Sequence, residues 1–162
     1  MIHLNIGSNL ESKFGDRFEN ISTAINLLSK SKVQIKKISD FYKTPSYPDK
    51  KLPYFINIGL TASYKNDETQ LLKIIKQIEN KIGRNKSKKN DPRVCDIDII
   101  DYNGYVLKGR LNLPHIMMHK RNFVLFPLHD IEKNWIHPIT KKNINKLILS
   151  LPVNEIRSIK QI

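Results

Sequence analysis

The chain has 162 residues, a length typical of one domain with its own hydrophobic core, so we expect a single domain over residues 1–162. No apolar run is long enough to cross a bilayer, and the first residues lack the basic segment and apolar stretch of a secretory signal. These features argue against a membrane protein and predict a cytoplasmic one. The only cysteine, Cys95, excludes an intrachain disulfide and fits a reducing compartment; it also reads simply as a small buried hydrophobic residue.

The formal net charge of +13 predicts an affinity for phosphates, whether in nucleic acids, nucleotides or anionic surfaces. Lysine greatly outnumbers arginine, and isoleucine and asparagine are abundant, so codon bias alone can produce this charge. Local clustering is more informative than the total. One short segment carries Arg84, Lys86, Lys88, Lys89 and Arg93.

The predicted elements in the first part of the chain alternate between strands and helices. A strand over residues 2–6 ends at Gly7-Ser8-Asn9, and apolar residues at helical spacing follow from Phe14 to Leu28. An extended segment over 33–41 and a strand over 55–60 suit an antiparallel pair, joined by a long proline-containing loop.

A second helix is the most clearly marked element. Asp67 followed by Gln70 resembles a capping box, and the apolar stripe that begins at Leu71 stops at Gly83, a natural C-terminal cap. Residues 84–92 are polar and cationic and predict a loop.

A strand over 94–102 completes the order strand, helix, strand, strand, helix, strand. This order favours an α+β ferredoxin-like sandwich, in which helices cover one face of an antiparallel sheet and leave the other face available. Short helices are expected at 122–131 and 142–149, in a C-terminal extension that wraps this core.

The last of these strands carries the most informative pattern. Alternation places Asp96 and Asp98 on one face and Ile97 and Ile99 on the other. Two carboxylates roughly 7 Å apart along a strand repel each other and resist desolvation unless a cation lies between them. A pair of divalent metal ions would supply that cation, and magnesium is the expected metal. The alternative is a solvated edge strand with polar alternation.

Acids on a rigid strand beside a cationic loop suit polyphosphate transfer, because metal ions and loop cations then neutralise phosphate oxygens together. The sequence has no glycine-rich phosphate loop, so side chains would have to form the phosphate cradle. Further on, His115 and Arg121 could contact phosphate and Phe123 could stack on a flat heterocycle. Alternatively, Phe123 belongs to a helix core and His115 caps a turn.

Several segments together resemble one family. They are Gly7-Ser8-Asn9-Leu10, Tyr42-Lys43-Thr44-Pro45, Phe55-Ile56-Asn57, Ile78-Glu79 with Gly83-Arg84, Pro92 to Asp98, and Pro114-His115 through Leu128. In this order, over roughly residues 2–138, the chain resembles the 6-hydroxymethyl-7,8-dihydropterin pyrophosphokinases of folate biosynthesis.

The resemblance implies transfer of the pyrophosphoryl group of ATP to the pterin hydroxymethyl oxygen, with release of AMP. It implies that Asp96 and Asp98 bind two Mg²⁺ ions, that Asp96 lies nearest the substrate hydroxyl, and that Arg93 and Lys86 take part in catalysis. The implied contacts to ATP are Glu79, Arg84, Lys86, Arg93, His115 and Arg121. The implied pterin contacts are Thr44, Pro45, Tyr47, Phe55, Asn57, Asp96 and Phe123.

The pterin assignment also makes physical sense. A pterin is flat and has donors and acceptors along one edge, so two aromatic rings and an amide can recognise it. Phe55 and Asn57 are two residues apart on a strand and share a face, although core packing of Phe55 is an alternative. The chain departs from the family at Asn90, at Asp91 and at Lys76, where a glutamine often contacts the nucleotide.

An RNA-binding module is the rival from another class, because a basic ferredoxin-like sheet is also the outline of an RNA-recognition motif. The strand that carries Phe55 lacks the basic-glycine-aromatic signature of that motif, and aspartates on the sheet would repel RNA phosphates. A relative without turnover is disfavoured because the main polar positions remain. We therefore expect a monomeric enzyme whose partners are ATP and hydroxymethyl-dihydropterin, with no nucleic acid and no membrane.

Overall fold

The computed structural model describes residues 1–46, 49–83 and 92–162. Its elements are β1 (Ile2–Ser8), α1 (Arg17–Lys30), β2 (Gln34–Ile38), β3 (Tyr42–Thr44), β4 (Phe55–Ser63), α2 (Glu68–Ile82), β5 (Asp96–Tyr102), a 3-10 turn η1 (Met118–Lys120), α3 (Asn122–Ile131), α4 (Ile144–Leu149), α5 (Val153–Ser158) and β6 (Lys160–Gln161). None of the described helices is long and apolar enough to span a membrane.

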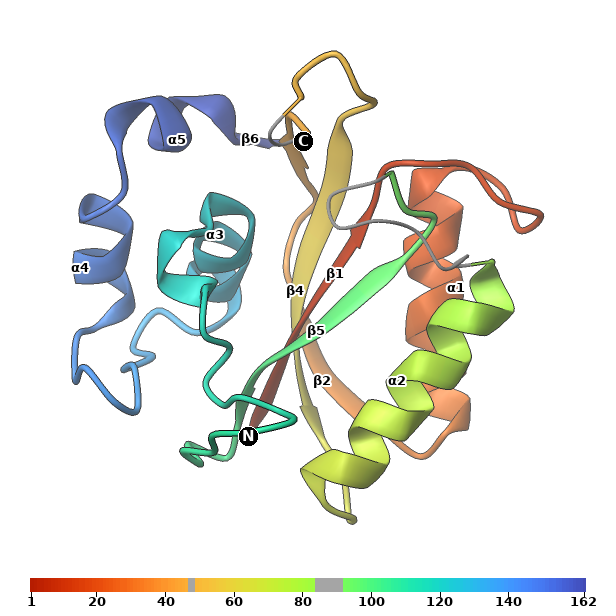
Figure 1. Cartoon of the computed structure of the whole chain (residues 1–162), viewed down its shortest axis with the longest axis horizontal. Coiled ribbons are helices and arrows are strands. Elements are labelled where there is room, and N and C mark those ends of the chain that lie inside the picture. Colours follow the sequence, from red (N-terminus) through yellow and green to blue (C-terminus); the bar gives the residue numbers. More distant parts are fainter. Residues whose placement is uncertain (47–48, 84–91) are drawn as a thin grey trace.

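The strands form one antiparallel sheet in the order β5-β1-β4-β3-β6 (Figure 1). β2 also pairs with β4, over residues 60–63, whereas β3 pairs with residues 55–57. The two short strands therefore follow one another along the same edge of β4, as the predicted antiparallel pair required. This arrangement confirms the α+β ferredoxin-like fold.

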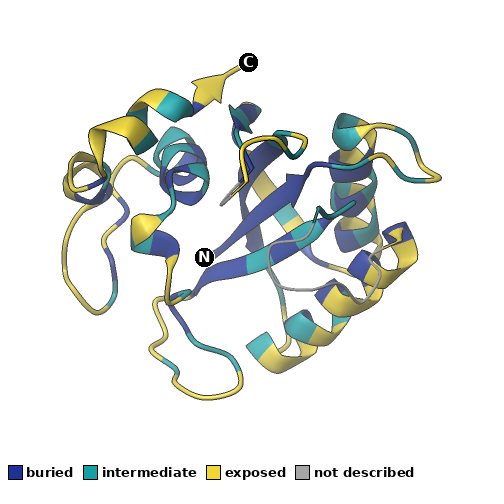
Figure 2. Ribbon diagram, turned by 45° about the horizontal axis from the view of Figure 1, so that its top comes forward, coloured by how far each residue is buried: buried dark blue, intermediate teal, exposed yellow. Residues whose placement is uncertain are grey.

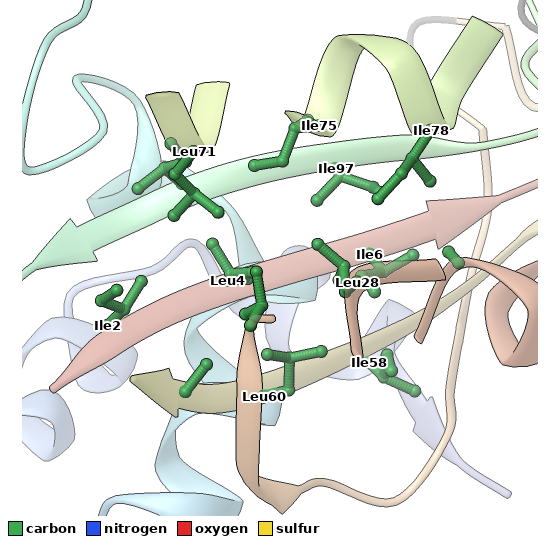
Figure 3. Packing of buried hydrophobic residues seen from close by; sticks show 14 of the residues in the cluster. Ile2, Leu4, Ile6, Leu28, Ile58, Leu60, Leu71, Ile75, Ile78 and Ile97 are labelled. Carbon is green, nitrogen blue, oxygen red and sulfur yellow. The ribbon is translucent and has the colours of Figure 1, made fainter. Parts of the chain in front are cut away.

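Helices α1 and α2 lie on one face of the sheet and enclose the larger hydrophobic core (Figure 1). Leu28 from α1 and Ile75 from α2 pack against strand residues such as Ile6 and Ile97 (Figure 3). These strand residues occupy alternate positions, so the residues between them face the opposite side of the sheet. That opposite side carries the polar residues of the candidate site.

The C-terminal third covers part of this second face (Figure 1). A smaller apolar cluster there includes Ile100 of β5, Leu125 of α3 and Leu147 of α4, together with Trp135 from the segment between α3 and α4. In Figure 2, most of the sheet and the inner parts of α1, α2 and α3 are coloured as buried, whereas exposed residues lie mainly on the outer parts of the helices. The prediction that the second face is left available is therefore wrong for the part under α3, because this part packs a core of its own.

Local capping sets the helix boundaries. α1 begins after Asp16, whose side chain accepts hydrogen bonds from the backbone of Phe18 and Glu19 in a capping box. Phe14, which the periodicity assigned to this helix, precedes it and is exposed, since Gly15 turns the chain at φ +124°. α2 was predicted correctly: Asp67 caps its start, although only the Asp67 half of the capping box is seen, and Gly83 ends it.

A β-bulge at Ile100 shapes the end of β5. Leu4 of β1 pairs with Ile99, whereas the preceding residue of β1, His3, pairs with Asp101, so Ile100 is the extra residue. Ile100 consequently joins the smaller core together with Trp135, and Asp101 faces the same side. The bulge lies two residues from Asp98, and the Ile100 carbonyl accepts a hydrogen bond from the His115 N–H.

The buried carboxylate of Asp101 ties the C-terminal layer to the sheet. Trp135 donates an Nε1–H hydrogen bond of 2.9 Å to Asp101, and His3 Nδ1 lies 3.5 Å from the same oxygen. Burial opposes ionisation of Asp101, but its partners His3 and Trp135 hold its pKa below the ordinary value.

Trp135→Phe should therefore destabilise the protein even though the aromatic packing is kept. The substitution leaves a buried carboxylate with one donor fewer, which costs about 1–3 kcal/mol of unfolding free energy. Urea denaturation followed by circular dichroism measures this, because the signal does not depend on the single tryptophan. Identical midpoints for the two proteins would show that the bond contributes nothing.

Candidate active site

The candidate site occupies one row of residues across the sheet, on the face opposite α1 and α2. Asp96 of β5 pairs with Gly7 of β1, Gly7 pairs with Asn57 of β4, and Asn57 pairs with Tyr42 of β3. Paired residues in an antiparallel sheet project to the same side. The acidic strand and the predicted pterin-binding strand thus lie on either side of a glycine.

Gly7 makes room for the side chains of β4. A Cβ atom at this position would lie 2.8 Å from Asn57 Oδ1 and 3.6 Å from the Phe55 ring. These two side chains therefore lean over β1 toward the aspartates. The shared face predicted for Phe55 and Asn57 is confirmed, since Ile56 between them points into the main core.

Because the resemblance assigns Asn57 to the pterin, we expect Gly7→Ala to weaken pterin binding. The new methyl group displaces Asn57 by overpacking, which typically costs about 1–3 kcal/mol, so the pterin dissociation constant should rise roughly five- to a hundredfold. Fluorescence titration with the pterin measures the change. ATP affinity serves as the internal control; an equal loss of both affinities would indicate general damage to the fold.

Asp96 and Asp98 of β5 are each paired with an arginine. Arg93 Nη1 lies 2.5 Å from Asp96 Oδ2, and Arg121 Nη1 lies 3.3 Å from Asp98 Oδ2. All four side chains are partly exposed, between 21% and 32%, so they are accessible to a ligand. β5 is an edge strand, as the alternative of a solvated edge strand predicted. It nevertheless brings two carboxylates and two guanidinium groups together.

The surroundings of Asp98 disfavour its ionised form. Burial raises its pKa above the ordinary value, and the charge of Asp96 raises it further. His115, Arg121 and Lys76 partly oppose this shift. A cation bound beside Asp98 would therefore stabilise its ionised form.

His115 is held by the bulge in β5. Its backbone N–H donates to the Ile100 carbonyl at 2.8 Å, and its Nδ1 accepts from the Met117 N–H at 3.2 Å. His115 thus caps a turn, as one interpretation predicted, and directs Nε2 as the nitrogen that can meet a ligand. Burial lowers the pKa of His115, although the negative charge of Asp98 acts in the opposite direction. The lowered pKa favours the neutral imidazole.

Ser8 and Asn9 hold the segment that leads into β5. Ser8 Oγ donates to the Val94 carbonyl at 2.7 Å, and Asn9 Oδ1 accepts from the Arg93 N–H at 2.6 Å. Asn9 Nδ2 also donates to the Pro53 carbonyl at 3.2 Å, on the loop before β4. Asn9 therefore joins the two sides of the site. The sequence interpretation gave it no role, although its place in the Gly7-Ser8-Asn9 turn was a signal.

Apart from Asp96, the described pterin candidates lie on β3 and β4, just after β3, and at the start of α3. Asn57 is buried and donates through Nδ2 to Thr44 Oγ1 at 3.0 Å, which fixes its amide, and Pro45 follows at the end of β3. Phe55 is half-buried. Phe123, at the start of α3, is half-buried as well, with the Arg121 guanidinium carbon 5.5 Å from its ring centroid. It packs at the margin of the smaller core, so part of the core interpretation also holds.

Glu79 is fully buried between α2 and β5 and accepts the backbone N–H of Ile97 at 2.9 Å. Lys76 Nζ lies 2.9 Å from its other oxygen. Glu79 therefore braces the acidic strand, and its contact with the nucleotide stays a prediction. Tyr47, Arg84 and Lys86, together with the departures Asn90 and Asp91, lie outside the described residues.

The carboxylates of Asp96 and Asp98 are suitable ligands for magnesium. Mg²⁺ is commonly held by one or two carboxylates together with substrate phosphates. Within residues 1–46, 49–83 and 92–162, no three His, Cys, Asp or Glu side chains form a metal-binding group. Asp96 and Asp98 supply the two carboxylates of such a shared site.

Comparison with known proteins agrees with this geometry. Residues 3–133 match the profile of the 7,8-dihydro-6-hydroxymethylpterin-pyrophosphokinase family. The chain is 40% identical over 153 residues to the folic acid synthesis protein FOL1 of Dictyostelium discoideum, covering 94% of this chain but only 22% of that protein.

A second relative is matched along most of its length. It is the 2-amino-4-hydroxy-6-hydroxymethyldihydropteridine pyrophosphokinase of Aquifex aeolicus, 36% identical over 146 residues, which are 90% of this chain and 88% of the relative. The fold matches the crystal structure of wild-type Plasmodium falciparum HPPK-DHPS with a TM-score of 0.71 and 17% identity, covering 90% of this chain and 43% of that one. The chain therefore belongs to the 7,8-dihydro-6-hydroxymethylpterin-pyrophosphokinase family, whose enzymes transfer the pyrophosphoryl group of ATP to hydroxymethyldihydropterin in folate biosynthesis.

Proposed function

We propose that this chain catalyses that reaction, with the row of residues from Asp96 to Asn57 as its active site. The observation that supports it best is the juxtaposition of an acidic, arginine-paired strand with an aromatic and amide pair, separated only by Gly7. The acidic side suits a metal-bound triphosphate, and the other side suits a flat heterocycle.

The chemistry is a displacement at the β-phosphorus of ATP. The hydroxymethyl oxygen of the pterin forms a bond to this phosphorus and loses its proton, while the bond to the oxygen bridging the α- and β-phosphates breaks. AMP leaves, and the pterin carries the diphosphate. Such a transfer requires orientation and charge neutralisation more than covalent help from the protein.

Asp96 and Asp98 would hold two magnesium ions, and Asp96 would lie nearest the attacking hydroxyl. When bound, magnesium neutralises and orients the phosphates. Arg93 and Arg121, which pair with these two aspartates, would donate to phosphate oxygens. His115 Nε2 and Glu79 complete the nucleotide side, together with Arg84 and Lys86.

The pterin would lie between the rings of Phe55 and Phe123. Asn57, whose amide is oriented by Thr44, reads its polar edge together with the backbone near Pro45. Tyr47 belongs to the same group of proposed contacts. We further propose a monomeric, cytoplasmic, single-domain enzyme.

The test is AMP formation from ATP, Mg²⁺ and 6-hydroxymethyl-7,8-dihydropterin, with a pterin-free control. We expect AMP to appear only when the pterin is present. No AMP above the control would refute the proposal. RNA binding in the absence of magnesium, with affinity that falls as salt is raised, would instead favour the rival interpretation.

A further inference from the structure

The structure points to Asn5 as a positioning residue for Phe123, the aromatic ring proposed to cover the pterin. Asn5 is in the middle of β1, 4% exposed, and faces the same side as its partners Asp98 and Gly59. A buried amide in the middle of a strand needs partners for its donors. This inference rests on the proposed function and adds a residue to it.

The reason for a polar residue here is found in α3. In an α-helix, the carbonyl of residue i accepts from the N–H of residue i+4. For Phe123 that residue is Pro127, which lies inside α3 and has no N–H. The proline ring also pushes the carbonyl four residues earlier away from the helix axis. The Phe123 carbonyl therefore requires a donor from outside the helix.

Asn5 supplies that donor. With its amide oriented so that the nitrogen faces the two neighbouring carbonyls, Nδ2 donates to Phe123 at 2.9 Å and to Ile58 of β4 at 3.0 Å. The amide has two N–H groups, one for each carbonyl. Asn5 thus fastens the first turn of α3 to the sheet.

Pro127 sets how closely α3 approaches the sheet beside this hydrogen bond. A Cβ atom at Gly59 would lie 3.0 Å from Pro127 Cβ and 3.1 Å from the Pro127 carbonyl carbon, so the helix rests directly on β4. Because Gly59 is the cross-strand partner of Asn5, the proline contact and the amide bond lie side by side. Together they set the height of Phe123 above the sheet. The Pro127 atoms that lie against Gly59 are Cβ and the backbone carbonyl, which alanine also has, so Pro127→Ala keeps this contact.

A variant cycle on Asn5 and Pro127 tests this role, because Pro127→Ala supplies the missing helical N–H. The measurements are the KM for pterin, the KM for ATP and the melting temperature of the full chain. Asn134→Ala, at an exposed asparagine in the turn before Trp135, serves as the matched control.

We expect Asn5→Ala to raise the KM for pterin roughly five- to thirtyfold, the effect of one buried carbonyl left without its donor, and the KM for ATP less than about twofold. Pro127→Ala alone and Asn134→Ala should stay within about threefold of the parent. In the double variant, the backbone N–H that Pro127→Ala introduces takes over as the donor, and the KM for pterin should return to within about threefold.

Equal increases of both KM values in Asn5→Ala, or no recovery in the double variant, would overturn the inference. If Asn5→Ala does not fold, the double variant decides: recovered folding and pterin affinity support the role, whereas a folded double variant with weak pterin affinity contradicts it. Absence of AMP formation by the parent chain would instead refute the proposed function.

Discussion

Asp98→Asn should abolish AMP formation and at the same time raise the melting temperature of the metal-free protein. Activity should fall on the order of a thousandfold or more, because the amide lacks the charge that holds magnesium beside the phosphates. Stability should rise, since the ionised Asp98 is crowded by burial and by Asp96.

The sign follows from proton linkage. The pKa of Asp98 is raised in the folded protein, so between its unfolded value near 4 and its folded value the folded state binds more protons. The free energy of unfolding therefore falls as pH rises through this window, and the ionised group is a cost at neutral pH. Removing the charge gains roughly 2–4 °C for each kcal/mol recovered. The attraction of Arg121 is already included in this balance, because the pKa of Asp98 is raised in its presence.

The measurement is a pair of thermal melts, with and without MgATP, beside the AMP assay. Glu132→Gln, which removes one negative charge at the far end of α3, is the control and should leave the activity unchanged. MgATP should stabilise the parent protein and the control but not Asp98→Asn. If Asp98→Asn kept near-normal turnover, or melted at a lower temperature than the parent without metal, Asp98 would not be a metal-binding acid.

Arg93→Ala should slow the transfer roughly a hundred- to thousandfold while changing pterin affinity little. Its guanidinium group pairs with Asp96, beside the place where the phosphates would be held, so its loss would remove a donor for the charge that develops on the phosphates. The backbone of Arg93 is fixed by Asn9 and remains in place in the variant.

Single-turnover rates and pterin dissociation constants separate these effects. Arg93→Lys should recover part of the rate, because it keeps the charge but loses the planar fork. Arg157→Ala, an exposed arginine on α5, should behave like the parent. Equal losses in rate and pterin affinity would point to a structural role of Arg93. Lys86→Ala is expected to act in the same direction.

Much of the fold follows from local pattern. The capped, amphipathic α2 and the alternation in β5 depend on neighbouring residues, and both were predicted correctly. The face shared by Asp96 and Asp98, and that shared by Phe55 and Asn57, follow from the two-residue period of a strand.

The features that escaped prediction depend on partners far along the chain. Asn9 binds Arg93 across 84 positions, and the need for Asn5 appears only when Pro127 is placed above it. The bulge at Ile100 arises from its register with β1, which no local pattern reveals. Coverage of the second face by α3 likewise depends on long-range packing. The assignments of individual residues to ATP and pterin remain predictions.

The most direct test of the central claim is product analysis with ATP labelled at its β-phosphorus. Transfer of a pyrophosphoryl group predicts that the label appears in the pterin diphosphate, with unlabelled AMP as the nucleotide product. Labelled ADP beside a pterin monophosphate would mean transfer of a single phosphoryl group and would contradict the account.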